Sequence, residues 1–226
     1  MRVILAGQRS FGQAVYDMLL EEGHTVMGVW SPFDVKAVFD DPHDRLTRAA
    51  LDDARWVAPI HRTPELTKIL EADLFVAAHS HDFIGRDSRA ATRLGGIGFH
   101  PSLLPRHRGR DAVRWTVHMG DPVTGGSVYW LTDNVDGGPV AAQDWCFVPP
   151  RYRQDVEWGT KELWRESLFP MGVRLIRNVL PDLDRGIMVE VPQEEDNATW
   201  EPSWERPPLH RPELPQLGSK GKRKHI

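Results

Sequence analysis

Two polar side chains stand where acid–base chemistry could be carried out, and the first is His100. It directly follows Gly96 to Phe99, a short apolar run that predicts a buried strand, and Pro101 and Pro105 stiffen the loop behind it. Histidine can give or take a proton near neutral pH, and its cation can stabilise a developing oxyanion. Position alone leaves open a histidine that only caps the turn or fills the core.

The second side chain is Asp136, within the turn-forming run Thr132 to Gly138. A carboxylate there could hold the proton of His100, orient its ring or position a water. Asp and Asn also favour turns, because their side chains bond to their own backbone, so turn formation alone can account for these residues. Composition does not decide whether the two residues act together.

The elements that would position His100 are read from the first hundred residues. Apolar runs predict strands over residues 2–6, 25–30, 54–59, 74–78 and 96–99, and helical spacing predicts helices over 11–22, 64–71 and 87–94. Strands that alternate with helices indicate an open α/β fold with a parallel sheet. His100 then lies at the carboxyl end of a strand, where such folds bind ligands.

The second half of the chain predicts a helix over 112–119 and a hairpin with strands over 126–132 and 139–148. A long helix follows over 160–179, interrupted or kinked near Pro170. From residue 192 the chain is rich in proline and ends in a basic cluster, in which no packed domain is expected. The predicted division is a catalytic domain over 1–191 and a partly disordered extension over 192–226.

Composition excludes several classes of protein. The net charge of -4 gives no overall attraction to nucleic acid or to an anionic membrane. Cys146 is the single cysteine, which rules out an intramolecular disulfide, argues against a cysteine-based zinc site and fits a reducing compartment. No apolar run reaches membrane-spanning length. We therefore expect a soluble, cytoplasmic protein that binds neither membranes nor nucleic acid.

Glycines near the N-terminus do not form a known nucleotide-binding motif. Gly7 and Gly12 follow the first strand, but the three spaced glycines of the dinucleotide fingerprint are absent, as is the Gly-Lys-Ser/Thr of a phosphate-binding loop. A tight strand-to-helix turn is the better interpretation.

A family resemblance connects the two candidate residues. HPSLLPRHRG from His100, with HDFIG at 81–85, GDPVTGGSVYW at 120–130, DNVDGGPV at 133–140 and PQEEDNATWEP at 192–202, resembles in order the formyltransferase superfamily that uses 10-formyltetrahydrofolate. Within that superfamily the segments are similar to the N-terminal hydrolase domain of 10-formyltetrahydrofolate dehydrogenase. The resemblance covers about residues 1–202 and implies a doubly wound, mostly parallel Rossmann-like sheet with helices on both faces.

The resemblance also implies an active site built from Asn, His and Asp. His100 and Asp136 match the His and the Asp, whereas Gly98 stands at the position of the Asn. In the transferases the Asn amide donates to the formyl oxygen, and loss of such a donor typically costs about 2.7 to 4 kcal/mol. The similar hydrolase domain lacks this Asn too. A water, a backbone amide, His79 or His81 could take its place.

The resemblance further implies 10-formyltetrahydrofolate as cosubstrate and no metal. Residues around the pterin would be Phe83, Ile84, Leu103, Leu104, Thr132, Asp133 and Val135, although the two leucines are equally good core residues. Arg106, Arg108 and Arg110 could bind an anionic acceptor or the glutamate tail of folate, or could simply be solvated.

The expected reaction is formyl transfer to an amine, on a small-molecule or carrier-bound acceptor, or to water, with release of tetrahydrofolate. Methionyl-tRNA formylation is disfavoured, because the additional C-terminal domain that it would require is not evident in the sequence. The alternative is a folate-binding or regulatory module with weakened catalysis, which the glycine at position 98 keeps open. The sequence leaves the acceptor and the oligomeric state open.

Overall fold

The computed structural model describes residues 1–31, 45–57, 70–80 and 83–204. The chain divides into two compact units, which are described separately. The first comprises residues 1–99, 130–133 and 176–188, and the second comprises residues 100–129, 134–175 and 189–226.

The first unit is a parallel α/β structure. Its elements are β1 (Arg2–Gly7), α1 (Arg9–Glu21), β2 (Thr25–Trp30), α3 (Arg45–Asp52), β3 (Trp56–Val57), β4 (Leu74–Ala78), α5 (Arg86–Ala90) and β5 (Gly96–His100), whose last residue belongs to the second unit. The strands lie in the order β3-β2-β1-β4-β5, and each pair is parallel. The change of direction between β3-β2-β1 and β4-β5 is the doubly wound arrangement.

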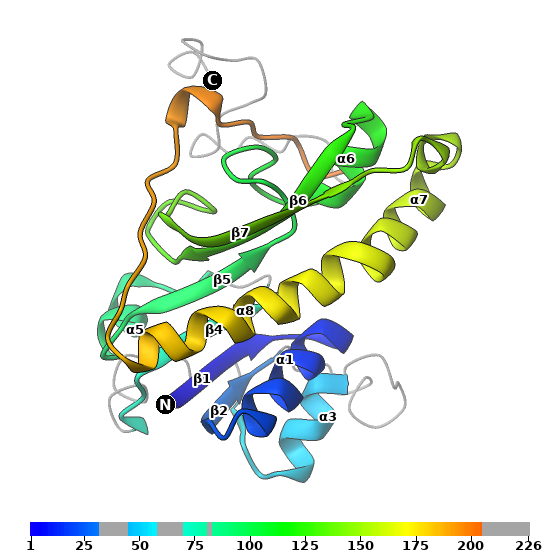
Figure 1. Ribbon diagram of the computed structural model, residues 1–226. Helices are drawn as coiled ribbons and strands as arrows, with labels where there is room; N and C mark the ends of the chain where they lie inside the picture. Colours follow the sequence, from blue (N-terminus) through cyan, green and yellow to red (C-terminus); the bar gives the residue numbers. More distant parts are fainter. Residues whose placement is uncertain (32–44, 58–69, 81–82, 205–226) are drawn as a thin grey trace. The chain divides into compact units, whose positions relative to one another are not determined.

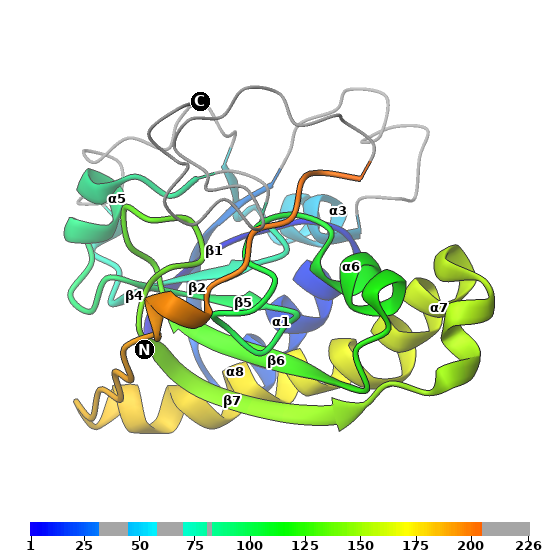
Figure 2. The ribbon, with the colours of Figure 1, turned by 90° about the horizontal axis from the view of Figure 1, so that it is seen from above.

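The apolar runs of the strands are buried on both faces. Ile4, Phe75 and Ile84 belong to one hydrophobic cluster, and Ile84 leads into α5. The alternate side chains Val3 and Leu5 are equally buried, and α1 and α3 lie side by side against the strands (Figures 1 and 2). Burial on both faces explains why the strands appear in the sequence as continuous apolar runs. The α/β class predicted from the sequence is confirmed.

The second unit is built on an antiparallel strand pair. Its elements are α6 (Ala112–Met119), β6 (Val123–Trp130), β7 (Val140–Phe147), a 3-10 helix (Pro150–Gln154), α7 (Val156–Leu163), a π-helical segment (Trp164–Leu168), the first part of α8 (Phe169–Asp184) and a short 3-10 helix (Glu195–Asn197). β6 and β7 pair from Val123↔Phe147 to Tyr129↔Val140 and curve together in Figure 2. The predicted hairpin is confirmed, with its first strand starting earlier than expected.

Pro170 explains the predicted interruption of the long helix. The helical run extends from 156 to 184, well beyond the predicted 160–179, and its π-helical segment ends at Leu168, two residues before Pro170. Proline has no N–H and collides with the carbonyl four residues earlier, so a widened turn at this point relieves the clash.

Other boundaries differ from the sequence-based expectation. The helix predicted over 87–94 covers only 86–90, because the Thr92 hydroxyl donates to the carbonyls of Arg89 and Gly95 and the chain turns there. Helix α3 was not predicted. Most of the helix predicted over 64–71 lies outside the described residues.

Residues 192–204, the first part of the extension predicted to form no packed domain, pack within the second unit. Val191 pairs with Val140 and Trp200 pairs with Arg108, so this segment, orange in Figure 1, runs along the loop that follows His100. Trp200 is 8% exposed and Glu201 is 7% exposed. The disorder predicted for the rest of the extension concerns residues 205–226, which lie outside the described part of the chain.

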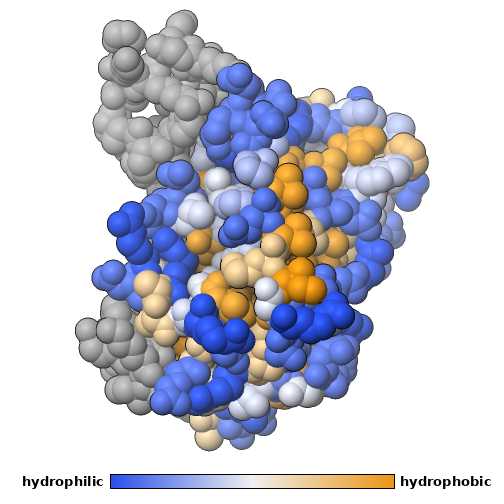
Figure 3. Space-filling view, turned by 60° about the vertical axis from the view of Figure 1, so that its left-hand side comes forward, coloured by the Kyte–Doolittle hydropathy of each residue, from blue (hydrophilic) through white to orange (hydrophobic). Residues whose placement is uncertain are grey.

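Apolar side chains also reach the surface, as the orange areas of Figure 3 show. Large exposed examples are Phe83, Trp145, Phe147, Ile187, Met188 and Val191. Among the described residues, no helix is long and apolar enough to cross a membrane.

Candidate active site

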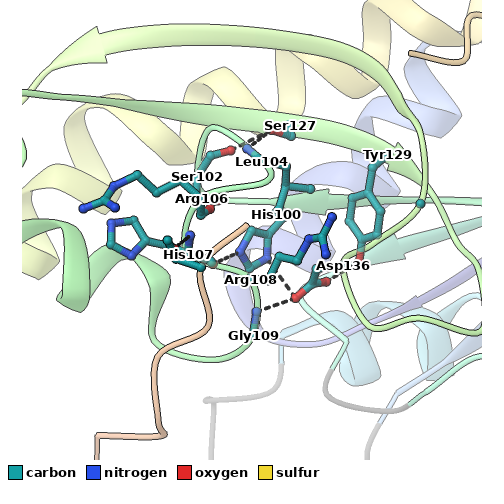
Figure 4. Close-up of polar contacts among 12 residues, drawn as sticks. His100, Ser102, Leu104, Arg106, His107, Arg108, Gly109, Ser127, Tyr129 and Asp136 are labelled. Atoms are coloured by element: carbon teal, nitrogen blue, oxygen red, sulfur yellow. Dashed lines mark hydrogen bonds and ion pairs between the residues drawn. The ribbon is translucent and has the colours of Figure 1, made fainter. Parts of the chain in front are cut away.

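His100 is held by a hydrogen bond on one ring nitrogen. Nε2 lies 2.6 Å from the carbonyl oxygen of His107, and the ring is buried (Figure 4). A carbonyl only accepts, so Nε2 must carry the proton. Nδ1 faces Oδ2 of Asp136 at 3.6 Å, beyond an ordinary hydrogen bond. The neutral ring therefore has its lone pair on Nδ1, and a proton taken up there would lie beside a carboxylate.

Asp136 is oriented by two donors from its own unit. Its Oδ1 accepts from the Tyr129 hydroxyl at 2.6 Å, and its Oδ2 accepts from the Gly109 amide at 2.8 Å (Figure 4). Burial, followed by the charge of Asp136, raises the pKa of Tyr129 well above its ordinary value of 10.0. Tyr129 therefore stays protonated and remains a donor at physiological pH.

Gly109 has a backbone conformation that favours glycine. Its φ of +95° is in the region that other residues avoid, although a Cβ there would make only an ordinary contact, 3.4 Å from the Trp200 ring. This conformation presents the Gly109 amide to Asp136. Gly109, the last residue of the HPSLLPRHRG segment, thus helps to orient the Asp136 carboxylate.

His107 lies seven residues after His100 and has a different environment. Its ring is 2% exposed, and Nε2 is 2.8 Å from Asp121 Oδ2. Nδ1 is 2.9 Å from Oε1 of the buried Glu201, a contact without hydrogen-bond geometry. Burial would raise the pKa of Asp121, but hydrogen bonds from Arg106 and His107 outweigh it and lower that pKa.

The three arginines predicted to bind anions have different environments. Arg106 binds Asp121 through two nitrogens at 2.7 and 2.8 Å. The buried Arg108 is bound to Gln193 and Glu195. Arg110 is exposed, and within the described ranges none of the identified hydrogen bonds or ion pairs involves its side chain. Arg106 and Arg108 thus serve the internal structure, which leaves Arg110 as the arginine open to a ligand.

Four of the predicted folate-binding residues belong to the first unit: Phe83, Ile84, Thr132 and Asp133. Phe83 is 58% exposed, whereas Ile84 is buried in the core. Arg89 connects three of them: it lies over the Phe83 ring and donates to the Ile84 carbonyl and to Asp133. Hydrogen bonds from Arg86 and Arg89 lower the pKa of Asp133.

The other three predicted folate-binding residues belong to the second unit: Leu103, Leu104 and Val135. Leu104 is buried and its amide donates to Ser127, while Leu103 packs against Gly125. Val135, next to Asp136, is 39% exposed. Leu104 is a core residue, and Val135 is accessible to a ligand.

Gly98 is buried in β5, paired in register with Ala77 of β4. His79, one of the side chains suggested to replace the missing Asn, follows β4 with a φ of +61°. His81, the other suggestion, lies outside the described residues.

Three residues that support these side chains were missed by sequence reasoning: Arg89, Tyr129 and Gln193. Tyr129 and Gln193 lie in segments quoted for the family resemblance, but spacing gave no sign of their hydrogen bonds. Within the described ranges, no three His, Cys, Asp or Glu side chains gather so as to hold a metal ion. The carboxylates of Asp121 and Glu201 lie against different nitrogens of the His107 ring, so these three side chains do not form such a group.

The fold and site define an α/β protein whose parallel strand β5 ends in a buried histidine beside a carboxylate. A model of the formyl transferase family matches residues 1–158. The chain is 36% identical over 211 residues to the mitochondrial 10-formyltetrahydrofolate dehydrogenase of Mus musculus, covering 89% of this chain and 22% of that protein. The chain belongs to the formyl transferase family.

Solved structures agree on the fold. Glycinamide ribonucleotide transformylase 1 from Symbiobacterium toebii matches with a TM-score of 0.66 and 20% identity, over 85% of this chain and 93% of that one. HypX from Aquifex aeolicus, in complex with tetrahydrofolic acid, matches with a TM-score of 0.63 and 19% identity, over 90% of this chain and 30% of that one. At these identities the structures show the formyltransferase fold alone.

Proposed function

We propose that this chain transfers the formyl group of 10-formyltetrahydrofolate to an amine or to water and releases tetrahydrofolate. The observation that carries the proposal is the buried pair of His100 and Asp136, in which Nε2 is committed to a carbonyl and Nδ1 faces the carboxylate. Family membership supplies the reaction class, and the dehydrogenase relative and the folate complex of HypX support folate as the formyl donor.

In the proposed mechanism a nucleophile attacks the formyl carbon, and Nδ1 of His100 takes up the proton that the nucleophile loses. The imidazolium that forms is stabilised by Asp136, because Oδ2 lies 3.6 Å from Nδ1. When the bond between the formyl carbon and N10 of the folate breaks, the proton returns from Nδ1 to N10. His100 thus serves first as base and then as acid.

Of the residues predicted to bind folate, Phe83 and Thr132 in the first unit and Val135 in the second are accessible to a ligand, and Arg110 of the second unit is available to the glutamate tail or an anionic acceptor. The exposed Phe83 ring offers a flat apolar surface, and Arg89 fixes it beside Asp133. Apolar walls with few oriented polar groups are typical of cofactor sites.

Water is the acceptor that the glycine at position 98 favours, since the hydrolase domain resembled by the sequence also lacks the Asn. The acceptor is tested by incubating the purified chain with 10-formyltetrahydrofolate and following tetrahydrofolate, with and without small amines and amino-sugar nucleotides. Release without an amine identifies a hydrolase, and release only with an amine identifies a transferase.

A folate-binding module with weakened catalysis is the second candidate, because Gly98 stands where the resembling transferases have the donor Asn. Tight binding of 10-formyltetrahydrofolate without turnover under any of these conditions would establish it and reject the enzyme. The same assay on His100→Ala separates turnover by this site from a contaminating activity.

A further inference from the structure

The turn that carries Asp136 has a backbone that needs support. Asp136 has a φ of +50°, a left-handed conformation that most non-glycine residues avoid. The side-chain amide of Gln193 provides the support: Nε2 donates to the carbonyls of Asp136 at 2.9 Å and Gly138 at 2.6 Å. One NH₂ group therefore holds the turn on both sides of Gly137.

The other end of the same amide holds the loop that follows His100. Oε1 of Gln193 accepts from Nε and Nη2 of Arg108 at 3.0 and 2.8 Å. Arg108 is 3% exposed and lies between His107, whose carbonyl accepts from His100, and Gly109, whose amide donates to Asp136. Both neighbours of Arg108 thus contact the proposed catalytic pair (Figure 4).

From these contacts we infer that Gln193 is a positioning residue that sets the separation of His100 and Asp136. The inference rests on the proposed function for its catalytic consequence. Gln193 touches neither reacting side chain, but it joins the backbone that presents Asp136 to the loop that presents His100. Only an amide can do this, because the two carbonyls require a donor and the guanidinium requires an acceptor.

The test compares Gln193→Glu with the wild-type chain. Glutamate keeps the size of the side chain and can still accept from Arg108, but it has no donor for the carbonyls of Asp136 and Gly138. We expect kcat to fall about 10- to 100-fold, as small misplacements of catalytic groups do, with KM for 10-formyltetrahydrofolate nearly unchanged. Glu194→Gln is the matched control, since it changes an exposed neighbour outside these bonds and should leave both constants unchanged.

A second measurement does not depend on turnover. Nitrogen-15 NMR of the histidine rings reports the surroundings of Nδ1 and Nε2 of His100. With Asp136 released from its turn, the His100 ring signals should move in Gln193→Glu and in Gln193→Ala, but not in Glu194→Gln. The signal is assigned by its loss in His100→Ala.

The inference is overturned if folded Gln193→Glu keeps both the wild-type His100 ring signals and the wild-type kcat. A variant that is only less stable, with unchanged ring signals in its folded fraction, also overturns it, because Gln193 would then be structural. If the wild-type chain has no turnover, the proposed function fails, and the NMR comparison alone decides whether Gln193 positions the pair. If Gln193→Glu does not fold, the same comparison on Gln193→Ala decides it.

Discussion

His100 ends β5 and His107 lies on the loop that follows it, and both rings face carboxylates, yet their surroundings differ. The ring of His107 has a carboxylate oxygen within 2.9 Å of each nitrogen and is almost fully enclosed. The ring of His100 has one nitrogen bound to a carbonyl and the other 3.6 Å from Asp136. Nδ1 of His100 thus has one carboxylate at a distance, whereas each nitrogen of His107 has one in close contact. Under the proposed mechanism, the more open nitrogen marks His100 as the reactive histidine and the enclosed ring of His107 as a structural one.

The largest expected effect is the loss of activity in His100→Ala. Removing the acid–base group should lower turnover of 10-formyltetrahydrofolate about 10²- to 10⁴-fold. The free energy of unfolding should fall by about 1 to 3 kcal/mol, because the His107 carbonyl loses its buried hydrogen bond. Steady-state kinetics and chemical denaturation of the same preparation measure both quantities. Near-normal turnover would remove His100 from the mechanism.

His107→Ala should lower stability more than it lowers activity. It leaves the buried Glu201 without the ring nitrogen that lies 2.9 Å from it and Asp121 without a hydrogen bond, and leaving buried polar groups unpaired typically costs about 1 to 3 kcal/mol each. The free energy of unfolding from denaturant titration measures the loss. Adding Glu201→Gln to His107→Ala should recover part of it. A cost below about 1 kcal/mol would mean that the pair contributes little.

Tyr129→Phe should have a moderate effect on activity. It removes the hydroxyl that donates to Asp136 Oδ1 but keeps the buried ring, at a cost of about 1 kcal/mol, or about fivefold in turnover. Tyr152→Phe is a matched control, because Tyr152 is also buried and donates its hydroxyl to a carboxylate, that of Glu166. Equal activities of the two variants would contradict a role for Tyr129 at the site.

The smallest expected effect is the pH dependence of the stability that Asp121 contributes. Its folded pKa lies below the ordinary value of 3.8, so it contributes stability that is present above that value and is lost as pH falls through the folded pKa. Asp121→Asn should be less stable than the wild type near neutrality, and the difference should narrow below about pH 3.8. Thermal melting across this range measures it, and a difference independent of pH would show that the charge of Asp121 is not involved.

The sequence by itself determined the α/β class, most strands of the first unit and the hairpin. These follow from local patterns, since continuous apolar runs such as Val3 to Ala6 predict strands buried on both faces. The sequence also singled out His100 and Asp136, but only the family resemblance joined them, because residues 36 positions apart share no local periodicity.

Tertiary structure alone decided which nitrogen of His100 is open, which arginines are bound internally and how the segment after residue 191 is used. Arg106, Arg108 and Arg110 look alike in the sequence, yet two of them are bound by carboxylates that lie 15 or more residues away. Gln193 lies 57 residues from Asp136 and bonds to its carbonyl. Such hydrogen bonds depend on the angle and distance between groups that only the folded chain brings together, and the order of residues does not encode them locally.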